Sequence, residues 1–355
     1  MALMSPLIAQ FWSLVIGVVS GLLAYAAGLP LPWMLGSMIG NMGFALAGAP
    51  IDGPTKLRPY VIPILGVMLG SAITADILSQ LGGWALTVVI LPLYLAVAAG
   101  LSFYVYRRVG GYDPVTAYYS AMPGGLNEML ILGGEAGGNE RKIALAHAAR
   151  VLLVILFVAL FFGLFLGVRS GANISNWIPL NAPSPMDYVY LLGAASVGSW
   201  LGKKARLPAA AVFGPMIVSG ILHAFKLVEI APPSVFVIAS QVVIGSIIGT
   251  RFIGATWREL RRDMGLAVLG TGVMLIVAVA FGAGIAWASH MSISQAFLAF
   301  APGGLTEMSL LTLAMNQDVA YVSTMHIIRI TVVVGVAAFV FGLLGKRIAK
   351  QTKEP

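Results

Sequence analysis

One short segment of this chain occurs twice, and this duplication limits the fold more than any other feature. Residues 123–129 read Pro-Gly-Gly-Leu-Asn-Glu-Met, and residues 302–308, 179 positions later, read Pro-Gly-Gly-Leu-Thr-Glu-Met. The same offset relates the histidine and arginine that follow each segment: His147 and Arg150 in the first copy, His326 and Arg329 in the second. Each copy thus holds a glycine-rich break, a carboxylate, an imidazole and a guanidinium within otherwise apolar sequence. This pattern predicts two equivalent polar sites inside a membrane.

The composition excludes a water-soluble globule. Hydrophobic residues make up 59% of the 355 residues, charged residues make up 10%, and the mean hydropathy is +0.93, whereas charged residues make up about 25% of typical soluble domains. The net charge of +8 comes from basic residues between apolar runs, which is typical of orientation signals and not of nucleic-acid binding. The chain has no cysteine, which excludes disulfides and thiolate chemistry. We therefore expect an all-α polytopic protein in a lipid bilayer, with no cofactor, metal or nucleic-acid partner.

Ten apolar runs each approach the ~17–25 residues that a membrane-spanning helix needs. They lie at residues 7–28, 31–49, 59–75, 84–106, 143–168, 186–202, 207–225, 232–250, 264–288 and 320–345. We therefore predict three segments: a first membrane repeat at 1–168, an external linker at 169–185 and a second membrane repeat at 186–355. The spacing Gly66/Gly70 recurs at the same offset as Gly245/Gly249, and such spacings indicate close helix packing.

Each repeat also contains a motif segment, at 113–136 and 293–316, whose path decides the topology. If both segments enter and leave on one side of the membrane, only two basic residues of the inter-helix loops, Arg169 and Lys226, lie outside the cell. This agrees with the positive-inside rule, whereas full crossings would divide the basic residues almost evenly. We therefore predict two re-entrant helical hairpins and cytoplasmic termini in a bacterial cytoplasmic (inner) membrane. Because five spans per repeat is an odd number, the second repeat should be inverted relative to the first.

The hairpin tips are the predicted substrate site. Each arm has about ten residues and reaches ~15 Å as a helix, half of a ~30 Å hydrocarbon core, so the tips should meet near the midplane. Unwound backbone at that depth is tolerated where it lines a cavity, and helices that begin at Leu126 and Leu305 would direct free N–H groups into it. The predicted substrate-binding residues are Pro123, Gly124, Gly125, Asn127 and Arg150 in the first copy, and Pro302, Gly303, Gly304, Thr306 and Arg329 in the second.

Counting residues from the hairpin exits predicts two ion pairs. Glu128 and Arg150 lie at equal distances on either side of Asn139, so antiparallel helices would place them at one depth, and Glu307 and Arg329 should pair in the same way. An unpaired charge would be costly there. Glu128, Glu307, His147 and His326 are therefore candidates for coupling and ion pairing. Two interpretations stay open: the pairs carry a proton during transport, or they only lock each hairpin to the next helix. For the two histidines, ordinary hydrogen-bonded packing is an equal alternative.

At these residues the sequence resembles a known family. The duplicated Pro-Gly-Gly-x-x-Glu-Met segment, followed by His-x-x-Arg at the start of the next span, resembles the bacterial AbrB-type membrane protein family over roughly residues 10–345. This duplicated family has also been labelled an ammonia monooxygenase and is linked by name to regulation of aidB expression. It is unrelated to the soluble AbrB transcription factors. The resemblance implies an integral membrane protein and a transporter assignment that rests largely on inference.

The expected function is secondary active transport of a small-molecule solute. No phosphate-binding loop of ATP-driven pumps is present, so a proton or another cation should supply the energy. The arginines and helix N-termini favour an organic anion, moved past the midplane by an elevator-like or rocking motion. A membrane-embedded ligand sensor that regulates gene expression is the alternative, although the short tail Lys346–Pro355 offers no soluble domain to relay a signal. A membrane oxygenase, and an enzyme generally, is disfavoured because the two motif histidines, His147 and His326, lie one per repeat and form no cluster of metal ligands. A homodimer is common for such architectures.

Overall fold

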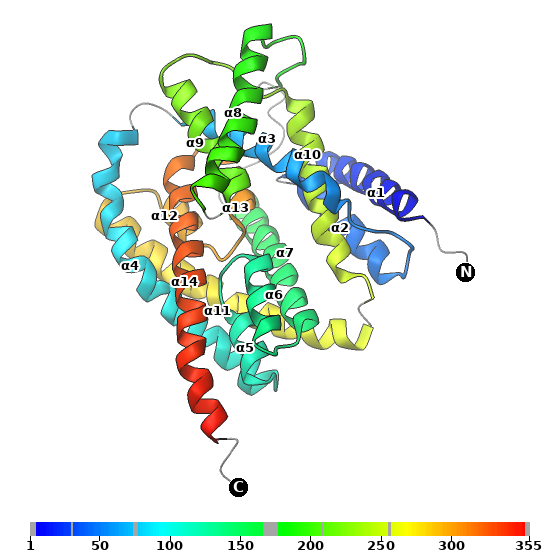
Figure 1. The fold of residues 1–355 in the computed structure, drawn as a ribbon, viewed down its shortest axis with the longest axis vertical. Coiled ribbons are helices and arrows are strands. Elements are labelled where there is room, and N and C mark those ends of the chain that lie inside the picture. The colour runs from blue at the N-terminus through cyan, green and yellow to red at the C-terminus, as the bar shows by residue number, and fades with distance from the viewer. Residues whose placement is uncertain are drawn as a thin grey trace.

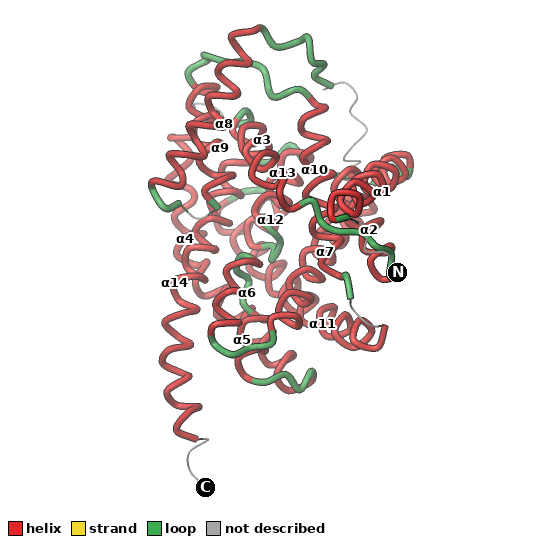
Figure 2. Tube along the Cα trace, turned by 45° about the vertical axis from the view of Figure 1, so that its right-hand side comes forward, coloured by secondary structure: helices red, strands yellow, loops and turns green. Residues whose placement is uncertain are grey.

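The described part of the chain is helical throughout in the computed structural model. The structure describes residues 5–29, 31–73, 77–165, 177–207, 209–254 and 257–351, and no β-strand occurs in these ranges (Figure 2). Within them, the side chains of residues 77–81, 127, 159–160, 162–165, 257–261 and 337–351 are outside the description. The first part of the predicted external linker, residues 169–176, lies outside the described residues.

The helices form two bundles, and each bundle combines elements from both halves of the chain (Figure 1). The six-helix bundle contains α1 (Pro6–Ala26), α2 (Pro32–Leu46), α3 (Arg58–Gly70), α8 (Pro185–Lys204), α9 (Ala210–Ala224) and α10 (Ser234–Gly249). The eight-helix bundle contains α4 (Ile77–Tyr104), α5 (Pro114–Ala121), α6 (Leu126–Glu135), α7 (Glu140–Phe165), α11 (Trp257–Ser289), α12 (Ile293–Phe300), α13 (Leu305–Ala314) and α14 (Val319–Gln351).

The contacts between helices repeat as the sequence does. In the six-helix bundle α1 packs on α2 as α8 packs on α9, and α10 packs on α2 as α3 packs on α9. In the eight-helix bundle α5 and α6 pack on α7 as α12 and α13 pack on α14, while α4 packs on α14 as α11 packs on α7. The pairs α2–α10, α3–α9, α4–α14 and α7–α11 each join one half of the chain to the other. The two halves are therefore interleaved and do not form separate bodies.

Helix lengths fit a multi-pass membrane protein. Each of the ten predicted apolar runs contains a helix, and five helices among the described residues are long and apolar enough to cross a bilayer: Pro6–Ala26, Gly82–Val109, Ser234–Phe252, Arg262–Ser289 and Val319–Val336. The α2, α3 and α9 helices are shorter than their predicted runs and have 15, 13 and 15 residues. The α2 helix ends before residue 49 because Gly48 adopts a left-handed φ of 76°, and Ala49 N–H then bonds to the Phe44 carbonyl. The predicted end of the third run, residue 75, lies outside the described residues.

Equivalent glycines make equivalent helix crossings in the six-helix bundle. A Cβ placed on Gly70 of α3 would lie 2.5 Å from the Met216 carbonyl oxygen of α9, and one placed on Gly249 of α10 would lie 2.5 Å from the Met38 carbonyl oxygen of α2. The glycine one turn earlier in each helix is equally confined by backbone. The prediction of close packing at these spacings is confirmed, and its cause is direct contact between helix backbones.

Each motif segment contains two short helices separated by extended backbone. The α5 and α12 helices have 8 residues each, and α6 and α13 have 10. Between them, residues 122–125 and 301–304 leave the helical conformation, with ψ angles of 126° at Met122 and 132° at Ala301. The helix–break–helix order agrees with the sequence prediction. It places a non-helical segment, with free backbone groups, deep within the protein.

Candidate functional site

Two side chains of α7 satisfy the carbonyls that the first break leaves free. In a continuous helix the Tyr119 carbonyl would accept from the amide of residue 123, but Pro123 has no N–H. The His147 Nε2 atom lies 2.8 Å from that carbonyl oxygen instead. Arg150 donates through Nη1 to the Met122 carbonyl at 2.8 Å and through Nη2 to the Gly124 carbonyl at 3.2 Å. Both side chains are buried, so α7 supplies the donors that the break removes.

The second copy has the same arrangement of side-chain donors on backbone carbonyls, called here the carbonyl lock. Its acceptor carbonyls lie 179 residues after those of the first copy. His326 Nε2 lies 2.8 Å from the Leu298 carbonyl oxygen, whose helical partner would have been the amide of residue 302, a proline. Arg329 donates to the Ala301 and Gly303 carbonyls, each at 2.5 Å, and is 2% exposed. The proline, histidine and arginine of the motif thus have one shared purpose. Proline breaks the helix, and the next helix supplies side-chain donors to the carbonyls that become free.

The predicted ion pairs, Glu128 with Arg150 and Glu307 with Arg329, are wrong. In both copies the Nη atoms of the arginine bond to backbone carbonyls, and no ion pair joins either arginine to its glutamate among the described residues. Counting residues from the hairpin exit predicts the depth of each side chain in the membrane, but it does not predict the direction in which the side chain points. A guanidinium presents several donors in a fixed fork and can satisfy two neighbouring carbonyls at once. The glutamates are left free to face another way.

The hydrogen bonds of His147 determine its tautomer. Because a carbonyl only accepts, Nε2 must carry the proton that Tyr119 receives. Arg150 Nη2 lies 2.9 Å from Nδ1, and because a guanidinium only donates, Nδ1 must be the acceptor. The imidazole is therefore neutral in this arrangement. The structure shows hydrogen-bonded packing for His147 and His326, whereas a role for either histidine in coupling stays a prediction.

The paired glycines of each break are required for close approach and not for an unusual turn. None of the four glycines has a positive φ, and Gly125 and Gly304 have φ angles of −66° and −77°. A Cβ on Gly125 would instead collide with the carboxylate of Glu128, and one on Gly304 would collide with that of Glu307. The first glycine of each pair packs in the same way against the methionine that ends the motif. Each carboxylate therefore folds back over the start of its own helix.

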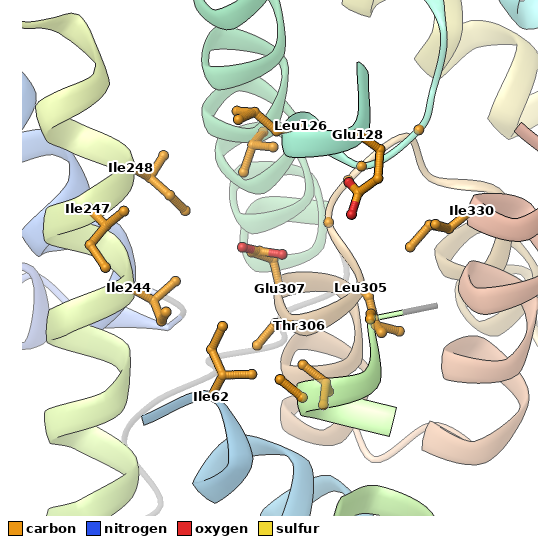
Figure 3. Close-up of a pocket in the computed structure, with 18 of the residues that line it drawn as sticks. Ile62, Leu126, Glu128, Ile244, Ile247, Ile248, Leu305, Thr306, Glu307 and Ile330 are labelled. Carbon is orange, nitrogen blue, oxygen red and sulfur yellow. The ribbon is translucent and has the colours of Figure 1, made fainter. Parts of the chain in front are cut away.

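Both breaks line one cavity of about 490 Å³. The eight-helix bundle contributes nine of the predicted polar-site residues to its wall: Gly124, Gly125, Glu128, Arg150, Gly303, Gly304, Thr306, Glu307 and Arg329. Figure 3 shows Glu128 and Glu307 directed into the same space from α6 and α13, with Ile244, Ile247 and Ile248 of α10 on the opposite side. The cavity therefore lies at the boundary between the two bundles, with polar groups on one side and an apolar helix face on the other.

The two glutamates differ in burial although their sequences are equivalent. Glu307 is 7% exposed, whereas Glu128 belongs to the exposed side chains. The remaining predicted residues lie behind the cavity wall or outside the description. Pro123 and Pro302 are buried without lining the cavity, His147 and His326 are fully buried beneath the breaks, and the side chain of Asn127 lies outside the described residues.

Several residues of the cavity wall were missed by the sequence analysis. The six-helix bundle contributes Arg58 at the start of α3, Arg251 after α10, and residues 209–212 at the start of α9. The two arginines were interpreted only as orientation signals. Their position beside α3 and α10, equivalent helices of the two repeats, is the signal that could have identified them. Among the described residues, no group of three or more histidine and acidic side chains could hold a metal ion.

Comparison with known proteins identifies the family of this chain. The sequence model of the family described as "Transition state regulatory protein AbrB" matches residues 33–345. The chain is similar to an Escherichia coli (strain K12) protein named "Putative regulator AbrB", with 24% identity over 86% of this chain and 87% of the relative. It is also similar to the Bacillus subtilis (strain 168) "Uncharacterized protein YhjN", with 25% identity over 95% of this chain and 94% of the relative. Because the family model spans most of its length, the chain belongs to the AbrB family.

Proposed function

We propose that this AbrB-family protein is a secondary active transporter that moves a small organic anion through the cavity between its two bundles. The observation that supports this function best is that both glycine-rich breaks line one cavity together with residues of the other bundle. A solute bound there would contact both bundles at once. Movement of one bundle relative to the other, elevator-like or rocking, would then open the site to alternate sides of the membrane. No catalytic role is proposed.

The proposed architecture is an inverted repeat of two five-span units, each with a re-entrant hairpin. The paired short helices support it, because 8 and 10 residues reach only ~12–15 Å as helix, too little to cross a ~30 Å hydrocarbon core. The repeated contacts α1–α2 with α8–α9, and α5–α7 with α12–α14, support two equivalent units. On this proposal both locked breaks lie near the midplane, where solute sites of inverted-repeat transporters are found.

The proposed orientation predicts a labelling pattern that single cysteines can test. We expect Arg141→Cys to react with an impermeant maleimide only from the cytoplasm, because this exposed residue lies in the first turn of α7, on the predicted inner side. Asp318→Cys, in the equivalent loop before α14, should react only from outside. The natural chain contains no cysteine, so the background is clean. Labelling of both positions from the same side would contradict an inverted repeat.

The charges of the cavity wall support an anionic solute. Four arginines and two glutamates line it: Arg58, Arg150, Arg251, Arg329, Glu128 and Glu307. In addition, α6, α9 and α13 all begin at the cavity, and the residue preceding each helix makes no side-chain capping bond. The positive ends of three helix dipoles therefore face the cavity, and at α6 and α13 the carboxylates of Glu128 and Glu307 fold back over them. The excess of positive charge therefore favours organic anions over neutral solutes and amines.

Uptake into proteoliposomes tests the transport function. We expect the purified protein to accumulate a member of a panel of radiolabelled mono- and dicarboxylates in the vesicle lumen when the lumen is made more alkaline than the medium. Accumulation should collapse when a protonophore removes the gradient, because the proton is the expected energy source. Protein-free vesicles are the control for passive entry of the uncharged acid. A solute that stabilises the protein yet never accumulates under a proton or cation gradient would contradict transport.

A solute that binds the protein but never accumulates is also the result expected for the second candidate function, a membrane-embedded ligand sensor. The observation that favours a sensor is the regulatory name of the Escherichia coli relative. A sensor would bind its ligand in the same cavity, but it would not catalyse net movement. Binding and accumulation measured on one preparation therefore separate the two functions.

A further inference from the structure

The cavity wall of the six-helix bundle carries two arginines that do not belong to the repeated motif. Arg58 begins α3, and Arg251 lies in the short turn that follows α10. The equivalent positions in the other repeat, 237 and 72, hold valine and alanine. Among the described residues, neither guanidinium makes a hydrogen bond or an ion pair. Unlike the two motif arginines, these side chains keep their donors available to a molecule in the cavity.

The two guanidinium groups lie near enough to repel each other electrostatically. Arg251 is half-buried, and surroundings of low dielectric strengthen such a repulsion. A carboxylate placed between the two groups would replace the repulsion with charge-assisted hydrogen bonds on both sides, because the planar fork of a guanidinium matches the two oxygens of a carboxylate. This part of the wall therefore suits one anionic group.

An apolar surface adjoins the two arginines on both helices. Ile62 lies four residues after Arg58, and Ile247 lies four residues before Arg251, so each isoleucine lies on the same helix face as its arginine. Ile244 continues this surface along α10, about 10 Å from Arg251. Figure 3 shows these isoleucines directed into the cavity. A solute held by its carboxylate would thus lay the rest of its length against hydrocarbon.

The opposite wall disfavours a second negative charge on the solute. The carboxylates of Glu128 and Glu307 cover the starts of α6 and α13, and both are directed into the cavity (Figure 3). The other side chains that Figure 3 shows on this wall include Leu126, Leu305 and Ile330, which are apolar. A second carboxylate at the far end of the solute would meet like charges in a partly apolar space. A methyl group at that end would meet hydrocarbon and no opposing charge.

We infer that the cavity binds a small aliphatic monocarboxylate, with its carboxylate between Arg58 and Arg251 and its hydrocarbon chain along the isoleucines of α3 and α10. The cavity volume of about 490 Å³ is typical of small-molecule sites. Because the equivalent positions in the other repeat hold valine and alanine, the duplicated architecture provides one such position and not two. This inference rests on the proposed function in taking the cavity as the solute site, and it names the class of solute.

The test compares each monocarboxylate with two relatives of the same chain length. Binding of butyrate, valerate and hexanoate, of their neutral amides, and of succinate, glutarate and adipate is measured by isothermal titration calorimetry on detergent-solubilised protein. Titration into protein-free detergent corrects for partition into micelles. We expect the monocarboxylate of fitting length to bind about 10–100-fold more tightly than its amide, as for hydrogen bonds to charged groups. It should also bind about tenfold or more tightly than its dicarboxylate, because of the like charges across the cavity.

Substitution of the two arginines tests the carboxylate position. Arg58→Gln and Arg251→Gln should each lower the ratio of acid to amide affinity about tenfold or more, with a much smaller effect on the amide itself. Arg58→Lys, which keeps the charge, should retain part of the preference. Lys56→Gln is the matched control, since it removes an equal charge from an exposed neighbour that does not line the cavity. This control should keep the full preference for the acid.

Substitutions of the other wall residues test the hydrocarbon position and the exclusion of dianions. Ile247→Ala should weaken the acid and its amide by the same factor, because both bury the same chain. A double variant with Glu128→Gln and Glu307→Gln should raise the affinity of glutarate relative to valerate, because the opposing charges are gone. A loss of folding alone would weaken valerate and glutarate alike and would leave their ratio unchanged.

Three results would overturn the inference: no binding of any monocarboxylate in the series, equal or tighter binding of the amide or dicarboxylate by the natural protein, or an unchanged acid-to-amide ratio in both arginine→glutamine variants. The transport proposal would survive each of these results if another solute accumulates in proteoliposomes. Conversely, a preference for the acid that is lost in the arginine variants, without accumulation of any solute, would support the monocarboxylate site and reject transport.

Discussion

Arg329→Met should lower the free energy of unfolding of the detergent-solubilised protein by about 2–6 kcal/mol, because each buried polar group left unsatisfied costs about 1–3 kcal/mol. The two groups are the Ala301 and Gly303 carbonyls, which both accept from this side chain. Arg150→Met should behave similarly in the first copy. Arg262→Met provides the matched control, since this exposed arginine donates to one carbonyl, that of Gly110. The loss in the control should be smaller in a denaturant titration followed by circular dichroism.

The same titration distinguishes the carbonyl lock from an ion pair. Glu307→Gln keeps the size of the side chain and removes only its charge, so it should change stability much less than Arg329→Met. The double variant should recover little of the stability that Arg329→Met loses, because the two side chains share a charge interaction but no hydrogen bond. Recovery of stability in the double variant would show instead that the arginine and the glutamate form a buried pair. The result therefore decides what holds the breaks in place.

Glu307→Gln should abolish accumulation driven by a proton gradient while leaving exchange of solute across the membrane partly intact. Burial disfavours the charge on the Glu307 carboxylate, whereas the neighbouring positive charges of Arg58 and Arg329 favour it. A bound anion would compete for Arg58, and Glu307 would then take up a proton together with the solute. Glutamine cannot take up that proton, so the gradient no longer drives uptake. Exchange requires only the loaded carrier and should persist.

Glu128→Gln is the matched control for coupling, because it is the equivalent residue in the first repeat but is exposed. The coupling proposed for Glu307 depends on burial, which Glu128 lacks, so this variant should keep most of the accumulation. Both rates are measured in the same proteoliposomes, with accumulation under an imposed gradient and exchange without one. Accumulation at the parental level in Glu307→Gln would assign this carboxylate to structure. A larger loss in Glu128→Gln than in Glu307→Gln would place the coupling proton on the other repeat.

Local features of the chain could be predicted because each depends on a few neighbouring residues. The helical breaks follow from proline and paired glycine inside apolar sequence, and close crossings follow from glycines one turn apart, such as Gly66 and Gly70. Membership of a duplicated helical family follows from the repeated motif. The burial of His147 and Arg150 follows from their position in an apolar run. All of these properties can be read from spacing and hydrophobicity.

Features that depend on direction or on distant contacts could not be predicted. Counting placed Glu307 and Arg329 at one depth, but it could not show that the arginine faces the carbonyls while the glutamate folds back over Gly304. The contribution of Arg58 and Arg251 to the cavity depends on how α3 and α10 pack against helices of the other half. No local pattern distinguishes an arginine that lines a cavity from one that signals orientation. The different burial of Glu128 and Glu307 likewise arises from tertiary packing, since their local sequences are nearly identical.

The interleaving of the two halves has a consequence for biosynthesis. The glycines of α3 pack against α9, and the glycines of α10 pack against α2. Helices of the first half therefore wait for helices of the second half, which are synthesised later. The first half of the nascent chain would reside in the bilayer with these close-packing faces covered only by lipid. A single ancestral unit would have met the same problem, and a second copy of itself would have supplied the missing faces. Gene duplication would then have joined into one polypeptide an assembly that already existed as two.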